Sequence, residues 1–175
     1  MTLEMRDTNR YGPLTEGRLQ QLEANLKARL PEDYRAFLLL HNGGRPTLSR
    51  FTFAVDGEEQ ESALEWFFAV HDQPYEEPED WGPDSGELPP HFGQPLEAVW
   101  EDLRSERPDS GVLPVGRDPS GNLVGIGYAG GRAGAVWWYD HEAESFAWLA
   151  GSFTEFLGGL TKLPPGDWVP WLAVE

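Results

Sequence analysis

One segment of the chain, LPEDYRAFLLLHNGG at residues 30–44, contains the start, the buried face and the end of a helix. Pro31 suits a first helical position, because its missing N–H would have no partner there. Apolar and aromatic side chains then recur three and four residues apart, which gives one face that must be buried. Asn42, Gly43 and Gly44 end the helix, since such residues tolerate the left-handed conformation of a helix C-terminus. A chain with this segment must therefore supply a core on which the helix packs.

Composition predicts that the chain is folded and extends over one domain. With 175 residues, 39% hydrophobic and 13% aromatic, it is long enough for a sizeable core. We expect a single domain over residues 1–175, with its core at about 15–160 and a tail rich in Pro and Trp at 164–175. The absence of cysteine excludes disulfides and thiol catalysis. No apolar run approaches the roughly 20 residues of a membrane span. The N-terminus is charged and does not resemble an export signal, so we expect a cytoplasmic protein.

Hydrophobic periodicity predicts the order of the secondary structure elements. Apolar spacing favours helices over residues 15–29, 30–44, 94–107 and 153–160. Alternating or short apolar runs favour strands over residues 50–55, 66–70, 112–116, 123–128, 135–139 and 146–149. Residues 56–62 are predicted as a polar connection, and residues 73–94 as a long loop. This order predicts an α+β fold: a mainly antiparallel sheet of about six strands, with an N-terminal helix pair and a C-terminal helix.

The charge of the chain is strongly negative and unevenly distributed. The net charge is −17, and residues 51–103 contain 15 of the 30 acids but neither Lys nor Arg. Such a chain is repelled by nucleic-acid phosphates and by anionic lipid, so we expect neither as a partner, and a basic protein fits instead. We predict a partner-binding surface in this segment, formed by Asp56, Glu58, Glu59, Glu61, Asp72, Glu76, Glu77, Glu79, Asp80 and Trp81.

One stretch matches the spacing of a dinucleotide-binding motif, because Gly125, Gly127 and Gly130 fit GxGxxG. That motif works when a strand leads into a helix whose N-terminus faces the pyrophosphate. Here the next predicted element is another strand, AVWWY at residues 135–139. The pattern therefore favours glycines required by a hairpin over a cofactor site.

Catalytic and metal-binding signals are weak. The four histidines, His41, His71, His91 and His141, show no HxH or HxxxH spacing, and the chain has no GxSxG motif. A metal site formed by His71, Asp72 and the acids of residues 76–80 is one alternative, but a solvated loop is the commoner fate of such a charge run. We expect no enzymatic activity, no cofactor and no metal, with a hydrolase or metal-dependent enzyme as the least favoured hypothesis.

Two adjacent tryptophans, Trp137 and Trp138, lie within a predicted strand. Successive side chains of a strand point to opposite faces of a sheet, so the two indoles must point apart. One of them is expected in the core, and the other covers a second face or belongs to an interface, where Trp is enriched.

Three segments, in order, resemble the SUKH superfamily of Smi/Knr-like domains. The first is the helix segment, and the other two are LPVGRDPSGNLVGIGYAGGRAGAVWWYDHE and FAWLAGSFTEFLGGL, which together extend the resemblance to about residues 15–160. The residues of the first segment that match the family motif are Leu30, Pro31, Tyr34, Phe37, Leu38, Asn42, Gly43 and Gly44.

The resemblance implies an α+β fold without catalysis, in which these motif residues determine the fold. Bacterial members resemble immunity proteins of toxin–immunity systems. The hypothesis is therefore an immunity protein that binds and neutralises a cognate, nuclease-type toxin through its acidic surface. The alternative is a non-catalytic regulatory module of the Smi/Knr type that binds another protein. The sequence does not indicate an oligomeric state.

Overall fold

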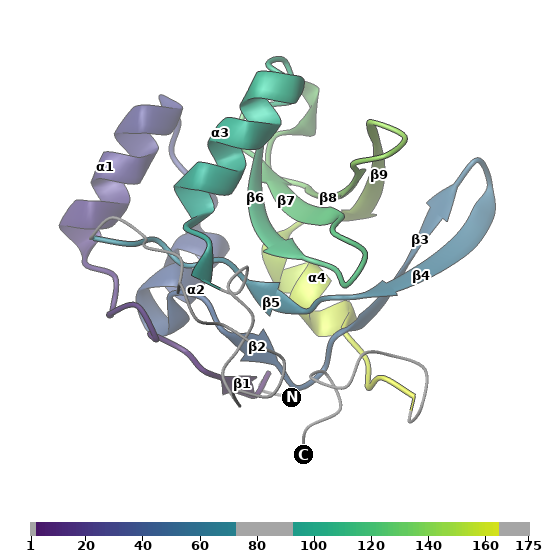
Figure 1. Ribbon diagram of the computed structural model, residues 1–175, viewed down its shortest axis with the longest axis horizontal. Coiled ribbons are helices and arrows are strands. Elements are labelled where there is room, and N and C mark those ends of the chain that lie inside the picture. Colours follow the sequence, from purple (N-terminus) through teal and green to yellow (C-terminus); the bar gives the residue numbers. More distant parts are fainter. Residues whose placement is uncertain (1–2, 73–92, 165–175) are drawn as a thin grey trace, which may run out of the picture.

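The structure is a computed structural model that describes residues 3–72 and 93–164, and its centre is a five-stranded antiparallel sheet (Figure 1). The strand order is β5-β6-β7-β8-β9, so each strand pairs with its neighbour in sequence. The strands are β5 (Trp66–Phe67), β6 (Val112–Arg117), β7 (Leu123–Gly127), β8 (Val136–Asp140) and β9 (Ser145–Ala150). The predicted α+β class and antiparallel meander are confirmed.

Two helices precede the sheet, α1 (Glu16–Leu26) and α2 (Glu32–His41), as predicted. The Thr15 side chain caps α1 by accepting a hydrogen bond from the Arg18 backbone N–H at 3.2 Å. Helix α1 ends before the predicted Arg29, because Lys27 adopts the left-handed conformation with φ of 55°. Pro31 is the N-cap of α2 and not its first helical residue, which corrects the sequence-based prediction by one position.

The buried face of α2 packs on the last helix, α4 (Phe153–Gly159). The ring of Phe153 meets those of Tyr34 and Phe37 edge-on, with ring centroids 5.0 and 5.1 Å apart. Such pairs stabilise a core by about 0.5–1.5 kcal/mol each beyond the area they bury. Helix α4 begins where predicted, because the Ser152 hydroxyl accepts a hydrogen bond from the Glu155 N–H at 3.1 Å. The first and last parts of the chain therefore share one core.

Strands β3 (Arg50–Val55) and β4 (Glu58–Ala63) form a hairpin that projects from the body at one end of its longest axis (Figure 1). The prediction of a polar connection over residues 56–62 is wrong, because most of that segment is strand β4. Asp56 and Gly57 have φ of 52° and 83°, which is the conformation of a two-residue hairpin turn. Residues 58–61 are exposed, so the strand lacks the apolar alternation that would have identified it.

Strand β5 is shorter than predicted and comprises only Trp66 and Phe67, which pair with β6. Ala69 instead forms a parallel bridge with Pro95, just before α3 (Leu96–Glu106). The remaining elements are the small sheet of β1 (Met5–Arg6) and β2 (Arg45–Pro46) and the 3₁₀ turn η2 (Gly130–Arg132).

The two faces of the five-stranded sheet bury different clusters. Trp138 belongs to the main core, which includes the hairpin, α2 and α4. Trp137 belongs to a smaller cluster with Tyr139 and with Leu103 of α3. The prediction that the two tryptophans point apart is confirmed. Among the described residues, no helix has the length and apolarity that crossing a membrane requires.

Candidate functional site

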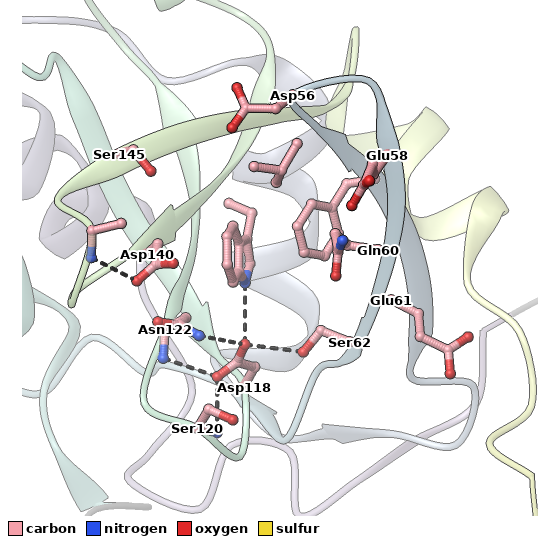
Figure 2. A pocket seen from close by; sticks show the side chains of 14 residues that line it. Asp56, Glu58, Gln60, Glu61, Ser62, Asp118, Ser120, Asn122, Asp140 and Ser145 are labelled. Atoms are coloured by element: carbon pink, nitrogen blue, oxygen red, sulfur yellow. Dashed lines mark hydrogen bonds between the residues drawn. The ribbon is translucent and has the colours of Figure 1, made fainter.

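A groove of about 480 Å³ lies between the β3–β4 hairpin and the segment where β8 turns into β9 (Figure 2). Fourteen residues line it, and five of them are acidic while none is Lys, Arg or His. The five acids are Asp56, Glu58, Glu61, Asp118 and Asp140. The groove is therefore a concave surface with a negative electrostatic potential. A cleft lined by charges of one sign focuses the electric field and attracts groups of the opposite charge.

Two aromatic rings form the apolar part of the groove. Phe53 of β3 packs against Trp138 of β8, with ring centroids 4.4 Å apart. Phe53 is buried, whereas Trp138 is only half-buried. The Trp138 indole N–H donates to the Asp118 carboxylate at 3.1 Å, so the orientation of its ring is fixed (Figure 2). A partly accessible aromatic surface beside carboxylates is suited to a cationic side chain.

Carboxylates from both walls border the groove. Asp56 and Glu58 belong to the hairpin and are exposed, and Asp140 reaches the groove from the end of β8 (Figure 2). Asp140 Oδ1 accepts hydrogen bonds from the backbone N–H groups of Glu142 and Ala143 at 2.9 and 3.0 Å. Its position is therefore fixed by the β8–β9 turn.

Asp118 lies at the base of the groove and joins its walls. The carboxylate is 1% exposed and accepts five hydrogen bonds from described residues. Two come from backbone N–H groups of its own turn, at Ser120 and Asn122, and a third from the Asn122 amide. The Ser62 hydroxyl and the Trp138 indole donate the other two. One buried carboxylate thus connects the hairpin, the β6–β7 turn and β8.

The sequence-based site did not include Asp118 or Asp140. The signal for Asp118 was its place in the turn DPSGN, because Asp side chains often bond to backbone N–H groups two residues further on. The signal for the hairpin itself was Asp56-Gly57, the dipeptide that favours a two-residue turn.

The structure brings some of the predicted partner-binding residues together and separates others. Strand pairing places Glu58 on the groove face, opposite Val55, and Glu59 on the other face, opposite Ala54. Glu61 also lies on that other face, points away from the groove (Figure 2) and forms an ion pair with Arg50, whose Nε lies 3.0 Å from Glu61 Oε2. The four hairpin acids therefore divide between two faces of the hairpin.

Asp72 lies away from the groove. Its carboxylate is 3.5 Å from Arg18 Nε of α1, and α1 and the hairpin are at opposite sides of the molecule (Figure 1). The predicted residues Glu76, Glu77, Glu79, Asp80 and Trp81 lie outside the described residues, as does His91.

The motif residues at the end of α2 have structural contacts. Asn42, Gly43 and Gly44 all have positive φ, at 37°, 88° and 116°. A Cβ on Gly44 would lie 2.7 Å from the carbonyl oxygen of Arg6, so the chain requires glycine there. Leu30, Tyr34, Phe37 and Leu38 of the same motif are buried in the main core.

The described residues give little support for catalysis or metal binding. They contain no group of three or more His, Asp or Glu residues arranged to hold a metal ion. His71 stacks on Tyr11 with ring centroids 4.3 Å apart, and burial and the nearby Arg18 charge lower its pKa. Burial also lowers the pKa of His41. Both effects favour neutral imidazoles within the fold.

The GxGxxG stretch has no dinucleotide geometry. Strand β7 leads through the 3₁₀ turn η2 into β8, so no α-helix N-terminus follows the glycines. A Cβ on Gly127 would overlap the carbonyl oxygen of Arg132, which explains the requirement for glycine by close backbone approach.

The helix pair, the antiparallel meander and the returning C-terminal helix define an α+β domain of the Smi/Knr-like class. The model of the SMI1 / KNR4 family (SUKH-1) matches residues 13–159, and the chain belongs to this family. The resemblance noted in the sequence is thereby confirmed. A search of the curated proteins found no match.

Proposed function

We propose that the chain is an immunity protein that binds and neutralises a basic, nuclease-type toxin in the cytoplasm, with the groove and the hairpin tip as its binding surface. The observation that carries the proposal is the groove, where Asp56, Glu58 and Asp140 supply negative charge and no lining residue is basic. Membership of the SUKH-1 family supports a role in protein interaction. The proposal assigns no catalytic step to the chain.

The charge of the surface suits an enzyme that acts on nucleic acid. Such enzymes hold phosphates with clustered Arg and Lys side chains. An acidic protein surface attracts the same side chains, and complementary charge raises association rates above those of neutral pairs. Binding there would block the cleft that the nucleic acid has to enter.

The groove also suits one basic side chain in particular. Its walls place Glu58 and Asp140 beside the Phe53–Trp138 pair. A guanidinium can pair with carboxylates and stack on an aromatic face at once, whereas an ammonium cannot stack in this way. We therefore assign an arginine of the partner to the groove.

The direct test measures binding to the product of an adjacent toxin-like gene. Co-expression should give a complex that co-purifies and cells that survive. The variant E58K/E59K reverses two exposed hairpin charges, and neither side chain belongs to the core. We expect it to slow association by about tenfold or more at low salt.

A matched control separates the site from overall charge. E101K/D102K changes the net charge equally, at exposed positions of α3 away from the groove. If the two variants slow association equally, the groove is not the binding site. If the cells die and no complex forms, the chain is not an immunity protein for this toxin.

The alternative, a regulatory module of the Smi/Knr type, fits the same family membership. It predicts a different result in one experiment. If affinity purification from the native cell recovers a housekeeping protein, and the toxin is neither bound nor neutralised, the regulatory function replaces the immunity function.

A further inference from the structure

The face of the sheet opposite the groove carries a second surface of opposite character. Phe146 and Trp148 alternate along β9, so they share a face, and β8 contributes Trp137 as the partner opposite Trp148. Trp148 is 53% exposed, and Phe146 and Trp137 are half-buried. Helix α3 packs on this face through Leu103, which lies in a cluster with Tyr139. The outer strands therefore expose a strip of aromatic side chains.

Two arginines flank this strip. The Arg132 guanidinium lies 4.3 Å from the Phe146 ring centroid and 5.5 Å from that of Trp137. The Arg107 guanidinium lies 5.5 Å from the same Phe146 ring. Arg132 donates to the Ser110 carbonyl oxygen and Arg107 to that of Glu144, and Arg107 also interacts with the Tyr139 hydroxyl. These contacts fix the arginines without neutralising them.

Acids outnumber bases by 30 to 13 in this chain, yet its arginines divide into paired and unpaired groups, and among the described residues Arg10, Arg104 and Arg117 also form no ion pair. Ion pairs hold Arg18, Arg29, Arg35, Arg45 and Arg50. Among the described residues, neither Arg107 nor Arg132 forms an ion pair, although Glu106 and Glu144 lie near the Tyr139 hydroxyl. The guanidinium groups of Arg107 and Arg132, both next to the Phe146 ring, therefore remain available to pair with a carboxylate of another molecule.

We propose that this Arg–aromatic face, defined as Arg107, Arg132, Trp137, Phe146 and Trp148, binds an extended acidic segment of a protein partner. Arg and Trp are the residues most enriched among energetically dominant interface positions. In an extended segment, side chains two residues apart point the same way and lie about 6–7 Å apart. Two such carboxylates can each pair with one arginine, while a third side chain in the row packs on Trp148.

The surrounding charge favours a short acidic protein segment over nucleic acid. The net charge of −17 repels a continuous row of phosphates. A segment with two carboxylates directed at the arginines, and uncharged residues elsewhere, avoids most of that repulsion. This surface is separate from the groove, so the inference does not depend on the immunity function.

The test uses the full chain and a labelled probe peptide, Ser-Leu-Ser-Glu-Ser-Glu-Ser-Leu-Ser, measured by fluorescence anisotropy at low salt. A peptide with glutamine in place of glutamate and a thymidine oligonucleotide serve as comparison probes. We expect the glutamate peptide to bind at least about tenfold more tightly than either, as for charge-assisted arginine pairs. Equal binding of both peptides, or stronger binding of the oligonucleotide, would overturn the proposal.

Variants locate the surface. R107Q/R132Q should reduce affinity at least about tenfold, and R107K/R132K should restore only part of it, because lysine lacks the planar fork. R10Q/R29Q, at two exposed arginines elsewhere, is the control of equal charge. Since the arginines also bond to backbone, W148A provides a second variant at an exposed position. If W148A and R107Q/R132Q both fold and both bind normally, the proposal fails.

Self-association is an outcome of the same experiment. Light scattering at increasing concentration should show a monomer whose mass does not change with W148A. A dimer that W148A disrupts would assign the Arg–aromatic face to a second copy of the chain and would overturn the acidic partner.

Discussion

The side-chain amide of Asn42 pairs with the backbone of Val70 as a neighbouring strand would. Asn42 Nδ2 donates to the Val70 carbonyl oxygen at 2.9 Å, and Asn42 Oδ1 accepts from the Val70 N–H at 2.9 Å. The same Nδ2 donates to the Gly12 carbonyl oxygen at 2.8 Å. One buried amide therefore joins the end of α2 to two segments that are distant in sequence.

Replacing Asn42 should unfold the chain at markedly lower urea concentration. N42A leaves three backbone groups without partners and puts alanine at a positive φ, so we expect the free energy of unfolding to fall by about 3 kcal/mol or more. N42G relieves the backbone strain but not the lost hydrogen bonds, so it should recover only part of this. N25A is the control, because Asn25 is exposed and makes one hydrogen bond, to Glu97. A loss as small as that of N25A would contradict the role of the amide.

The second prediction concerns the buried Arg35. The residue is 3% exposed, and its side chain is paired with Glu23 at 2.5 Å and with Glu16, both on α1. R35M leaves those carboxylates without their cation, and we expect a loss of about 3–5 kcal/mol in the free energy of unfolding. R29M removes the exposed pair with Glu32 and should cost less than about 1 kcal/mol. Chemical denaturation of both variants measures the difference.

Glu23 offers a check on that interpretation. Its Oε1 also accepts a hydrogen bond from the Leu30 N–H at 2.8 Å, at the corner between α1 and α2. E23Q keeps one oxygen that can accept from the Leu30 N–H, but it loses the charge and places an NH2 group, which cannot accept, toward Arg35. A cost for E23Q equal to that for R35M would show that the ion pair, and not the corner, determines the stability of the helix pair.

The third prediction is that Asp118 controls the hairpin separately from the core. In D118N one acceptor oxygen becomes an amide donor and faces the Ser62 hydroxyl and the Trp138 indole. We expect a loss of about 1–3 kcal/mol, as for a buried group left unsatisfied. Amide hydrogen exchange should accelerate first in β3 and β4. D102N, at an exposed position, is the control and should change neither the free energy of unfolding nor the exchange of β3 and β4. If D118N leaves the hydrogen exchange of the hairpin unchanged, Asp118 does not hold the hairpin in place.

The fourth prediction concerns pH. In the folded chain, burial lowers the pKa of both His41 and His71 below the ordinary value of 6.5. Between the folded and unfolded pKa values the unfolded chain binds more protons, so this contribution to stability is lost as pH falls below about 6.5. Tyr11, Arg18 and Asp72 contact or lie near His71, and Phe37 packs on His41.

The measurement compares the free energy of unfolding at pH 8 and pH 5 in the native chain and in H41Q/H71Q. The variant should lose less stability over this interval, because its glutamines do not titrate. H141Q controls for the loss of an exposed imidazole, and a variant that responds to pH as the native chain does would contradict the prediction.

Most of the fold could be predicted because its signals are local. The helix at Glu32–His41 has its buried face and its stop within 15 residues of sequence, and the capped α4 begins at Ser152 as its hydroxyl requires. Strand β4 was missed because residues 58–61 face solvent, so the hairpin depends on its turn and on pairing with β3. No apolar pattern can indicate a strand of that kind.

The groove could be predicted only in part. Its acids Asp56, Glu58 and Glu61 lie in the base-free segment, but Asp118 and Asp140 come from turns about 60 and 80 residues later along the chain. Their approach depends on how the hairpin packs on β8 and β9. The Arg–aromatic face was missed for the same reason, since Arg107 and Phe146 meet only in the folded sheet.

The hairpin is attached to the body at its base and through Phe53 of β3, which packs on Trp138, while its tip is exposed. Arg50 exchanges backbone hydrogen bonds with Thr161 at 3.1 and 2.9 Å, and Ser62 bonds to Asp118, whereas residues 56–60 at the tip are all exposed. Substitutions at the tip therefore leave the core unchanged. Under natural selection, such a chain can exchange one set of tip residues for another without first acquiring compensating changes in its interior. Recognition and foldability can then evolve independently.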